Sequence, residues 1–229
     1  ALAREGEDLF YRGEIGATLA AFCQASGGHL DRLDLENYQV IERQPLTFRF
    51  GGARIHTNPA PSAGGGRIRH TLETLMADAP DDPGPRSPAQ ALGATERARG
   101  ALRDDSVQGR RGSTLVSVVD GAGNLASMTL SNGEGSGCLI GETGIMTNNM
   151  LGEEDINPEG IGNWQPDRRL GSMLAPTLVI ADGMQVALGS GGSNRIRSAI
   201  VQVLVALLQH GASPAQAVDE PRLHVETDL

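Results

Sequence analysis

The sequence predicts an α+β fold of layered sheets and helices, and two observations lead to this prediction. Two β-hairpins are visible: Thr114–Ser131, which turns through a Gly- and Asn-rich stretch, and Pro176–Leu188, which turns through an Asp-Gly pair. Stretches with helical periodicity lie before and after these hairpins. Strand hairpins flanked by helices indicate sheets covered by helices in a layered α+β domain.

The first third of the chain predicts helices at both ends and strands between them. The expected elements, in order, are a helical region 1–26 stopped by Ser-Gly-Gly, a short helix or turn 33–38, a strand 39–50, a strand 53–57, a Pro- and Gly-rich bend 58–66, and a helix from 67 to about 77. Pro45 lies inside the strand 39–50, so this segment is expected to be an edge strand or two pieces.

Residues 78–112 are predicted to be mainly loop. Segment 78–88 holds four prolines and three aspartates, which favours an exposed loop; a helix near 89–102 and a polar linker 103–112 follow. Near the end of the chain, an apolar helix 195–209 is stopped by Gly211. Ser213 and Pro214 then supply the N-cap and first-turn residues of a last short helix.

Composition limits the functions that fit. The chain of 229 residues can bury one sizeable core or two small domains, and its net charge of −9 argues against nucleic acid and anionic membrane surfaces as partners. No apolar run is long enough to span a bilayer, and no signal peptide is visible. Cys23 and Cys138 are expected to be small buried side chains rather than a disulfide.

A glycine and two hydroxyl residues stand at the beginning of the first hairpin. Ser113 and Thr114 follow Gly112 and lead into the strand Leu115–Asp120. If the bond before such a residue is cut, its own α-amine becomes a general base with a pKa of roughly 7.7–8, which suits neutral pH. The hydroxyl is then the nucleophile, and no histidine is needed. The alternative is an exposed serine in a linker.

Four blocks follow one another in a specific order: the turn Asp120–Asn124, the glycine-rich Asn132–Gly137, the segment Thr147–Asp155, and Leu188–Arg195. In this order they resemble the small subunit of the gamma-glutamyltranspeptidase (glutathione hydrolase) family, whose members are N-terminal-nucleophile hydrolases. Residues 1–77 resemble the end of that family's large subunit, through Asp8–Gly13, Gly27-Gly28, Leu33–Tyr38 and Pro59–Gly65.

The resemblance implies a fold and a division of the chain. It narrows the α+β class to a four-layer α-β-β-α sandwich. Residues 1–112 become the C-terminal part of a large-subunit-like region, and residues 113–229 become the small-subunit-like catalytic region, the two forming one intertwined domain. The chain begins in what looks like the middle of a helix and stops where relatives continue, so we expect a fragment or an abbreviated member.

The resemblance also implies an activity. The chain is expected to be a zymogen that cuts itself between Gly112 and Ser113, and then to form a γ-glutamyl ester from glutathione-like γ-glutamyl amides. Water or an acceptor amino acid resolves the ester. No cofactor or nucleic-acid partner is expected. We expect the large-like and small-like parts to associate, and the protein to form a homo-oligomer. The family favours a periplasmic or secreted location, and the lack of a visible signal peptide leaves the cytoplasm open.

Matching this sequence to the family's motifs residue by residue indicates which residues would form the active site. Ser113 stands at the family's catalytic threonine, with Thr114 as the fallback nucleophile, and Ser131 at a threonine that hydrogen-bonds the nucleophile. Asn132 and Ser172 match residues that bind the substrate's α-carboxylate, and Glu153 matches an acid that binds its α-amine. The alternative for Ser131 and Asn132 is turn chemistry, and the alternative for the acidic run at Glu153 is a solvated surface.

Three positions depart from the family's pattern. Leu115 replaces a common histidine, Met150 replaces a Gln or Glu that assists amine binding, and Gly171 replaces the first of two serines. A thioether cannot match the hydrogen bond of an amide or a carboxylate. These departures keep two other classes open: a related amidase or acylase, and a fragment that folds without being processed.

Two successive glycines before the last long helix suggest an anion site. Backbone N–H groups of Gly191 and Gly192 can point at one spot, which makes an oxyanion hole if the nucleophile faces them. One such donor is typically worth about 2.7–4 kcal/mol. A phosphate-binding loop is the weaker alternative because Gly-Lys-Ser/Thr is missing, and a tight turn without a ligand is the simplest. The five histidines show no metal-ligand spacing.

Overall fold

The computed structural model describes residues 2–78, 113–153, 156–157 and 160–225. The predicted loop 78–88, from residue 79 on, the predicted helix 89–102 and the linker 103–112 lie outside the described residues. The chain forms two compact units: residues 1–43 with 135–149, and residues 44–134 with 150–229. The predicted division at residue 112 concerns where the chain is cut and stays a prediction.

The first unit is helical. Its helices are α1 (Leu2–Glu5), α2 (Asp8–Tyr11), α3 (Glu14–Ala25) and α4 (Arg32–Glu36). The predicted continuous helical region 1–26 is broken at Gly6, whose φ of 65° is left-handed, and again at Gly13. Leu19, Ala20, Leu35 and Ile140 form its small core. Asp31 and Asp34 cap α4 reciprocally, which confirms the predicted short helix.

The second unit contains a four-stranded antiparallel sheet. The strands are β1 (Leu46–Phe50), β2 (Ala53–Thr57), β5 (Thr177–Ala181) and β6 (Met184–Leu188), in the order β1-β2-β5-β6. The strand predicted for 39–50 begins only after Pro45, in agreement with the expected interruption. Gly51 and Gly52, both at positive φ, make the tight turn between β1 and β2. The predicted second hairpin is β5–β6.

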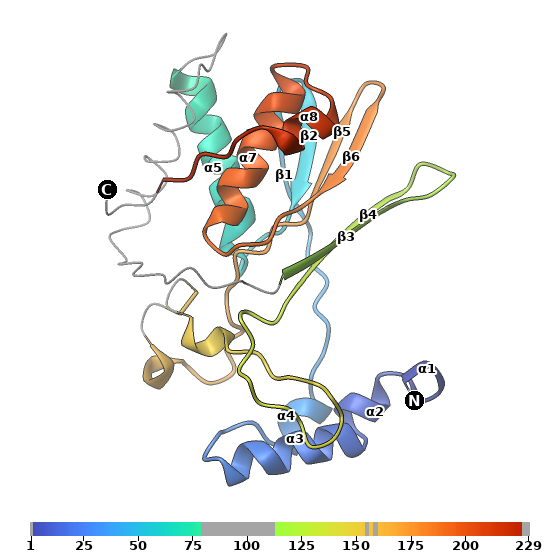
Figure 1. Cartoon of the computed structure of the whole chain (residues 1–229), viewed down its shortest axis with the longest axis vertical. Helices are drawn as coiled ribbons and strands as arrows, with labels where there is room; N and C mark the ends of the chain where they lie inside the picture. Colours follow the sequence, from blue (N-terminus) through green and yellow to red (C-terminus); the bar gives the residue numbers. More distant parts are fainter. Residues whose placement is uncertain (1, 79–112, 154–155, 158–159, 226–229) are drawn as a thin grey trace. The chain divides into compact units, whose positions relative to one another are not determined.

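Helices α5 (Ala63–Asp78) and α7 (Arg195–Leu208) lie side by side and pack on the sheet (Figure 1). The hydrophobic core between these elements includes Phe50, Ile55, Ile68, Leu72, Leu75, Val179, Ile196, Ile200 and Leu204. Because hydrophobic residues recur at helical spacing along both helices, each presents one apolar stripe to the sheet.

Helix α5 begins at Ala63, four residues before the predicted Arg67. A Cβ at Gly64 would collide with the Met173 carbonyl, and one at Gly65 would collide with the Asn58 carbonyl. The glycines of the predicted bend therefore belong to the first turn of the helix, where they let its backbone approach neighbouring chain segments closely.

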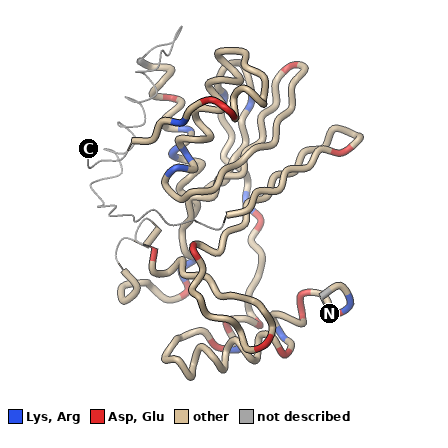
Figure 2. The backbone as a smooth tube through the Cα atoms, in the orientation of Figure 1, with Lys and Arg blue, Asp and Glu red and all other residues tan. Residues whose placement is uncertain are grey.

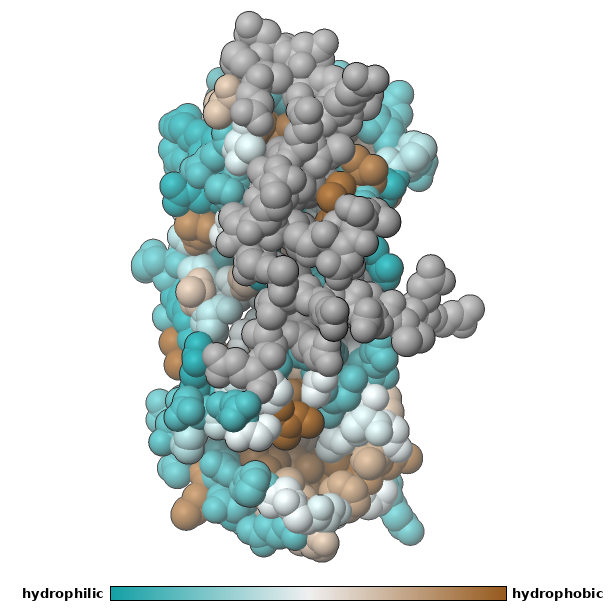
Figure 3. All heavy atoms as spheres, turned by 90° about the vertical axis from the view of Figure 1, so that its left-hand side faces the viewer, coloured by the Kyte–Doolittle hydropathy of each residue, from teal (hydrophilic) through white to brown (hydrophobic). Residues whose placement is uncertain are grey.

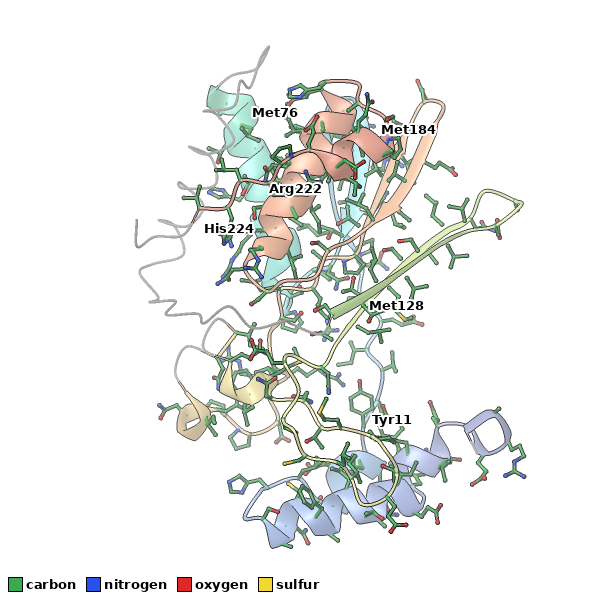
Figure 4. The ribbon with its side chains drawn as sticks, in the orientation of Figure 1. Tyr11, Met76, Met128, Met184, Arg222 and His224 are labelled. Atoms are coloured by element: carbon green, nitrogen blue, oxygen red, sulfur yellow. The ribbon has the colours of Figure 1, made fainter. Side chains whose placement is uncertain are left out.

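The C-terminal segment is tied to α7. Gln202 donates from its side-chain nitrogen to the Leu223 carbonyl at 2.7 Å and accepts from the Leu223 N–H at 2.8 Å. Figure 4 shows Arg222 and His224 beside α7. Helix α8 (Pro214–Asp219) precedes this segment, and the Ser213 side chain caps it as predicted.

The remaining hairpin, β3 (Ser113–Val119) with β4 (Leu125–Ser131), lies against β6 and β5. Leu115 faces this sheet, because a Cβ at Gly189 would lie 2.5 Å from its Cδ1, and Ser127 Oγ donates to the Leu188 carbonyl at 3.2 Å. Helices, four-stranded sheet and hairpin make three consecutive layers, α-β-β (Figure 1). The described residues of this unit form no second helical layer over the hairpin.

The hairpin's outer side is apolar. Val118 is 53% exposed and Met128 51% exposed, and Val116 and Leu130 are similarly open. Figure 4 shows Met128 on the side turned away from β5 and β6. By contrast, the described atoms on the face in Figure 3 are mainly hydrophilic, with scattered hydrophobic patches. Among the described helices, none is both long and apolar enough to cross a membrane.

Candidate active site

Ser113 is the first residue of β3 and lies directly opposite Ser131, the last residue of β4. The Ser113 hydroxyl donates to Ser131 Oγ at 3.1 Å, and Ser131 Oγ also accepts from the Gly133 N–H at 3.1 Å. The hairpin register therefore joins residues 18 positions apart, and it fixes the orientation of the candidate nucleophile through a neighbouring hydroxyl.

Thr114, the fallback nucleophile, is exposed and pairs with Leu130. Successive residues of a strand point to opposite faces. Thr114 consequently lies on the outer face with Val116 and Val118, whereas Ser113 lies on the face turned toward the sheet. The structure thus places Ser113 at the candidate site and Thr114 away from it.

The loop between β6 and α7 closes on Ser113. A Cβ at Gly191 would lie 3.0 Å from Ser113 Cβ and 3.7 Å from its Oγ, so only glycine allows this approach without displacement. Gly192 has a φ of 109° and Ser193 a φ of 51°. A loop with positive φ values that touches the nucleophile fits an oxyanion hole. That role of Gly191 and Gly192 stays a prediction.

One pocket opens beside Ser113. Its lining includes the polar side chains of Ser113, Ser131, Glu153, Ser172 and Ser193, the backbone of Gly133, and the apolar side chains of Met150, Ile156, Met173, Leu174 and Ile196. Four of the predicted site residues thus share one pocket: Ser113, Ser131, Glu153 and Ser172. Glu153 supplies the only charged side chain among the lining residues.

Three further predicted residues, Asn132, Gly191 and Gly192, are not among the residues that line the pocket. Asn132 follows Ser131 and is half-buried, but it is not among the pocket's lining residues. Gly192 lies in the closing loop, also outside the lining set. Sequence reasoning missed Ser193, whose side chain lines the pocket from that loop. The sequence signal was the position of Ser193 between two glycines and the start of a helix, because a tight turn there needs a residue with a left-handed backbone conformation.

The backbone around Ser172 is held by the beginning of α5. The Ala63 N–H donates to the Ser172 carbonyl at 2.8 Å, and Ser62 Oγ donates to the Leu174 carbonyl at 2.6 Å. The Ser172 carbonyl is therefore occupied by structural contacts. Its side chain is left on the pocket side, where a hydroxyl can donate to an anionic oxygen.

Glu153 is held by a short turn. Residues Met150–Gly152 form a 3₁₀ turn, and the Glu153 N–H donates to the Met150 carbonyl at 3.1 Å. The buried Asn157 donates its N–H to the Glu153 carbonyl at 2.9 Å and its side-chain amide to the Leu151 carbonyl at 2.6 Å. A second 3₁₀ turn, Ile161–Asn163, follows. The same turn therefore places an acid and a thioether, Met150, at the pocket.

Within the described ranges, no three His, Cys, Asp or Glu side chains come together in a way that could hold a metal ion. The pocket offers hydroxyl groups, a carboxylate and closely approaching backbone. Such a set can position an amide carbonyl against a hydroxyl nucleophile and bind a cationic group near it.

Similar proteins were found by sequence and by structure. The family model described as Gamma-glutamyltranspeptidase matches residues 1–99 and 86–228. The chain is 27% identical to the glutathione hydrolase proenzyme of Escherichia coli (strain K12), over 97% of this chain and 49% of the relative. It is 28% identical to the acylase ACY 1 proenzyme of Pseudomonas sp. (strain SE83), over 98% and 48% respectively.

The fold also has a solved counterpart. The crystal structure of cephalosporin acylase from Bacillus halodurans matches with a TM-score of 0.77 at 20% identity, covering 96% of this chain and 48% of that one. This similarity confirms the predicted α+β fold of the N-terminal-nucleophile hydrolase type. The chain spans about half the length of the relatives it matches.

Proposed function

Because the chain belongs to the gamma-glutamyltranspeptidase family, we propose that it hydrolyses or transfers γ-glutamyl amides, using Ser113 as an N-terminal nucleophile. One observation carries the proposal: Ser113 begins a strand, donates a hydrogen bond to Ser131, touches Gly191 and opens onto a pocket with one carboxylate. No side-chain base is needed if the chain is cut before Ser113.

Maturation creates the nucleophile. The Ser113 hydroxyl attacks the Gly112 carbonyl carbon, and the acyl group moves from the Ser113 nitrogen to its oxygen. Water then hydrolyses this ester, leaving a carboxylate on Gly112 and a free α-amine on Ser113. Both relatives named above are proenzymes, which supports a processed precursor.

Turnover uses the same atoms. The Ser113 α-amine takes the hydroxyl proton while the hydroxyl oxygen attacks the γ-amide carbon. Backbone N–H groups at Gly191 and Gly192 stabilise the oxyanion. The C–N bond then breaks, the proton passes to the leaving amine, and a γ-glutamyl ester remains. Water or an acceptor amine attacks this ester and restores the hydroxyl.

Substrate binding rests on the two charged groups that the γ-glutamyl group carries on its α-carbon. Glu153 binds the α-ammonium group, and Ser172 with Asn132 donates hydrogen bonds to the α-carboxylate. Charge-assisted hydrogen bonds of this kind are the stronger ones. The substrate is a small molecule such as glutathione, and association of the two cleaved parts keeps the site assembled.

A second candidate is an acylase acting on less polar acyl groups. Five apolar side chains line the pocket, among them Met150, which replaces a polar residue of the family pattern. The similarity to an acylase proenzyme is as high as the similarity to a glutathione hydrolase. Comparing γ-glutamyl and glutaryl 4-nitroanilides separates the two, because a glutaryl group lacks the α-amine that Glu153 would bind.

The sequence offers a sharp test of cleavage, because it contains no lysine. An amine-reactive label then finds one amine in the uncut chain and a second one, at Ser113, after cleavage. Intact mass spectrometry after incubation at neutral pH should show fragments meeting at Gly112/Ser113 and two labels. Ser113→Ala should stay uncut with one label, and Ser113→Thr should still cleave.

The same preparations are then assayed with γ-glutamyl 4-nitroanilide. Release of nitroaniline by the cleaved protein, and none by Ser113→Ala, is the expected result. An uncut wild-type chain without turnover, or unchanged turnover in Ser113→Ala, would overturn the proposal.

A further inference from the structure

Arg195 and Arg197 lie two residues apart at the beginning of α7, and their surroundings differ. Figure 2 marks basic positions along the backbone in blue. Arg197 is only 2% exposed; it donates to the Asn194 carbonyl at 2.9 Å and the Val225 carbonyl at 3.4 Å. Arg195 is exposed, and within the described part of the chain its guanidinium has neither a hydrogen bond nor an ion pair. Arg197 thus has a structural role, because its buried guanidinium binds backbone carbonyls. The described contacts assign no such role to Arg195.

The Arg195 side chain lies over the loop that closes on the nucleophile. A Cβ at Gly192 would lie 3.4 Å from Arg195 Nε and 3.7 Å from Nη2, and the neighbouring Gly191 is the residue that touches Ser113. Ser193 and Ile196, the residues on the pocket side of this turn, line the pocket, whereas Arg195 does not. The guanidinium is therefore beside the pocket rather than inside it.

We propose that Arg195 binds a carboxylate on the amine half of the substrate, which means the leaving group in the first step and the acceptor in the second. This inference rests on the proposed function. The acyl group fills the pocket beside Ser113, so the amine half extends out of it, past the glycine loop. A peptide or amino acid with a free carboxylate is the chemistry that fits a guanidinium at that place.

Charge favours this division of the substrate. Among the described residues that line the pocket, Glu153 alone is charged, and its carboxylate attracts an ammonium group and repels another carboxylate. The whole chain carries a net charge of −9, which disfavours the approach of any anion. Arg195, which has no partner among the described residues and lies beside the glycine loop that approaches Ser113, offsets this repulsion locally. Its planar guanidinium matches the two oxygens of a carboxylate.

The first test needs no turnover. The full chain is titrated with the leaving-group amine 5-amino-2-nitrobenzoate and with uncharged 4-nitroaniline, and binding is followed by ligand-detected NMR. Wild type should bind the carboxylated amine about threefold to tenfold more tightly, as expected for a partly exposed ion pair. Arg195→Ala should abolish this preference, and Arg195→Lys should keep part of it. Arg49→Ala, which removes an exposed arginine of β1, should keep all of it.

The second test uses turnover of γ-glutamyl 4-nitroanilide and γ-glutamyl 3-carboxy-4-nitroanilide. Arg195→Ala should raise KM about threefold to tenfold for the carboxylated substrate alone, with kcat unchanged. An equal rise for both substrates would instead assign Arg195 to the α-carboxylate shared by them and overturn the proposal, as would equal binding of the two amines by wild type. If wild type turns over neither anilide, the proposed function fails while the binding comparison still decides the role of Arg195.

Discussion

The four-stranded sheet and the β3–β4 hairpin are built on opposite patterns. In β2, Ala53, Ile55 and Thr57 are buried against the helices while Arg54 is exposed, so apolar residues face inward. In the hairpin, hydroxyl residues such as Ser127 face the neighbouring sheet and the apolar Val118 and Met128 face outward. The sheet and its helices therefore contain the buried core, and the hairpin carries the proposed nucleophile, Ser113.

Leu204→Ala tests the sheet side of this comparison and should have the largest effect. Leu204 is fully buried in the core between α7 and the sheet. Its truncation leaves a cavity and should lower the free energy of unfolding by about 2–4 kcal/mol. Urea unfolding followed by circular dichroism measures the loss.

Val118→Ala on the hairpin is the matched substitution. Because this side chain is more than half exposed, the change should cost less than about 0.5 kcal/mol. Equal losses for the two variants would show that the hairpin's outer face is as important for stability as the core.

Gly191→Ala should separate activity from stability. The new methyl group would lie 3.0 Å from Ser113 Cβ, which forces the nucleophile to shift by a few tenths of an ångström. We expect a tenfold to hundredfold loss of kcat, with an unfolding free energy within about 1 kcal/mol of wild type. Gly121→Ala in the hairpin turn, where no atom lies within 4 Å of a new Cβ, is the control and should be active.

Gly171→Ser should improve binding modestly. A Cβ at Gly171 would meet only the carbonyls of Pro61 at 3.4 Å and Ile156 at 3.9 Å, so the family's first serine fits here. An added hydroxyl beside Ser172 should lower KM for γ-glutamyl 4-nitroanilide by about threefold to tenfold. The same variant assayed with the glutaryl anilide shows the effect of the hydroxyl without the α-amine; a KM unchanged for both would contradict a carboxylate site at Ser172.

Replacing Asp120 should have the smallest effect, a loss of stability limited to the β3–β4 turn. The Asn124 side chain, and then the backbone N–H groups of Asn124, Ala122 and Gly123, hold the pKa of Asp120 below its usual value. A depressed pKa means that the carboxylate stabilises the turn above the unfolded-state pKa of about 3.9, and that this stabilisation disappears as pH falls through the lower folded-state pKa.

Amide exchange of Ala122 and Asn124 by NMR measures this effect. Asp120→Ala should increase their exchange relative to wild type near neutral pH, after correction for the intrinsic pH dependence. The difference should vanish in acid below the folded-state pKa. A difference that persists there would mean that the charge of Asp120 is not what stabilises the turn.

Much of the scaffold could be predicted from local pattern. The hairpin around Asp120–Asn124 follows from turn residues between alternating segments, and its register brings Ser113 to Ser131 without further information. The start of α5 was misplaced for a physical reason. Gly64 and Gly65 have low helix propensity, yet they lie in the first turn of the helix, where a Cβ would collide with the carbonyls of Met173 and Asn58.

The site was predictable only in part. Motif order pointed to Glu153 and Ser172, which the structure brings to one pocket with Ser113. For Ser193 the sequence offered only its place between two glycines and a helix start, and for Arg195 it offered no signal. The left-handed φ of Ser193 and the lack of a partner for Arg195 among the described residues depend on how the loop folds. Tertiary placement, which no single segment encodes, distinguishes Arg195 from Arg197.

Two hydrogen bonds join Gln202 to Leu223, because the Gln202 side chain offers both a donor and an acceptor to one residue of the C-terminal segment. Glutamate has the same shape, yet it can offer the donor only while its carboxyl group is protonated. A Gln202→Glu substitution would therefore make the attachment of the C-terminal segment to α7 depend on pH. The C-terminal segment should be held more tightly at low pH than near neutrality, where the ionised carboxylate repels the Leu223 carbonyl.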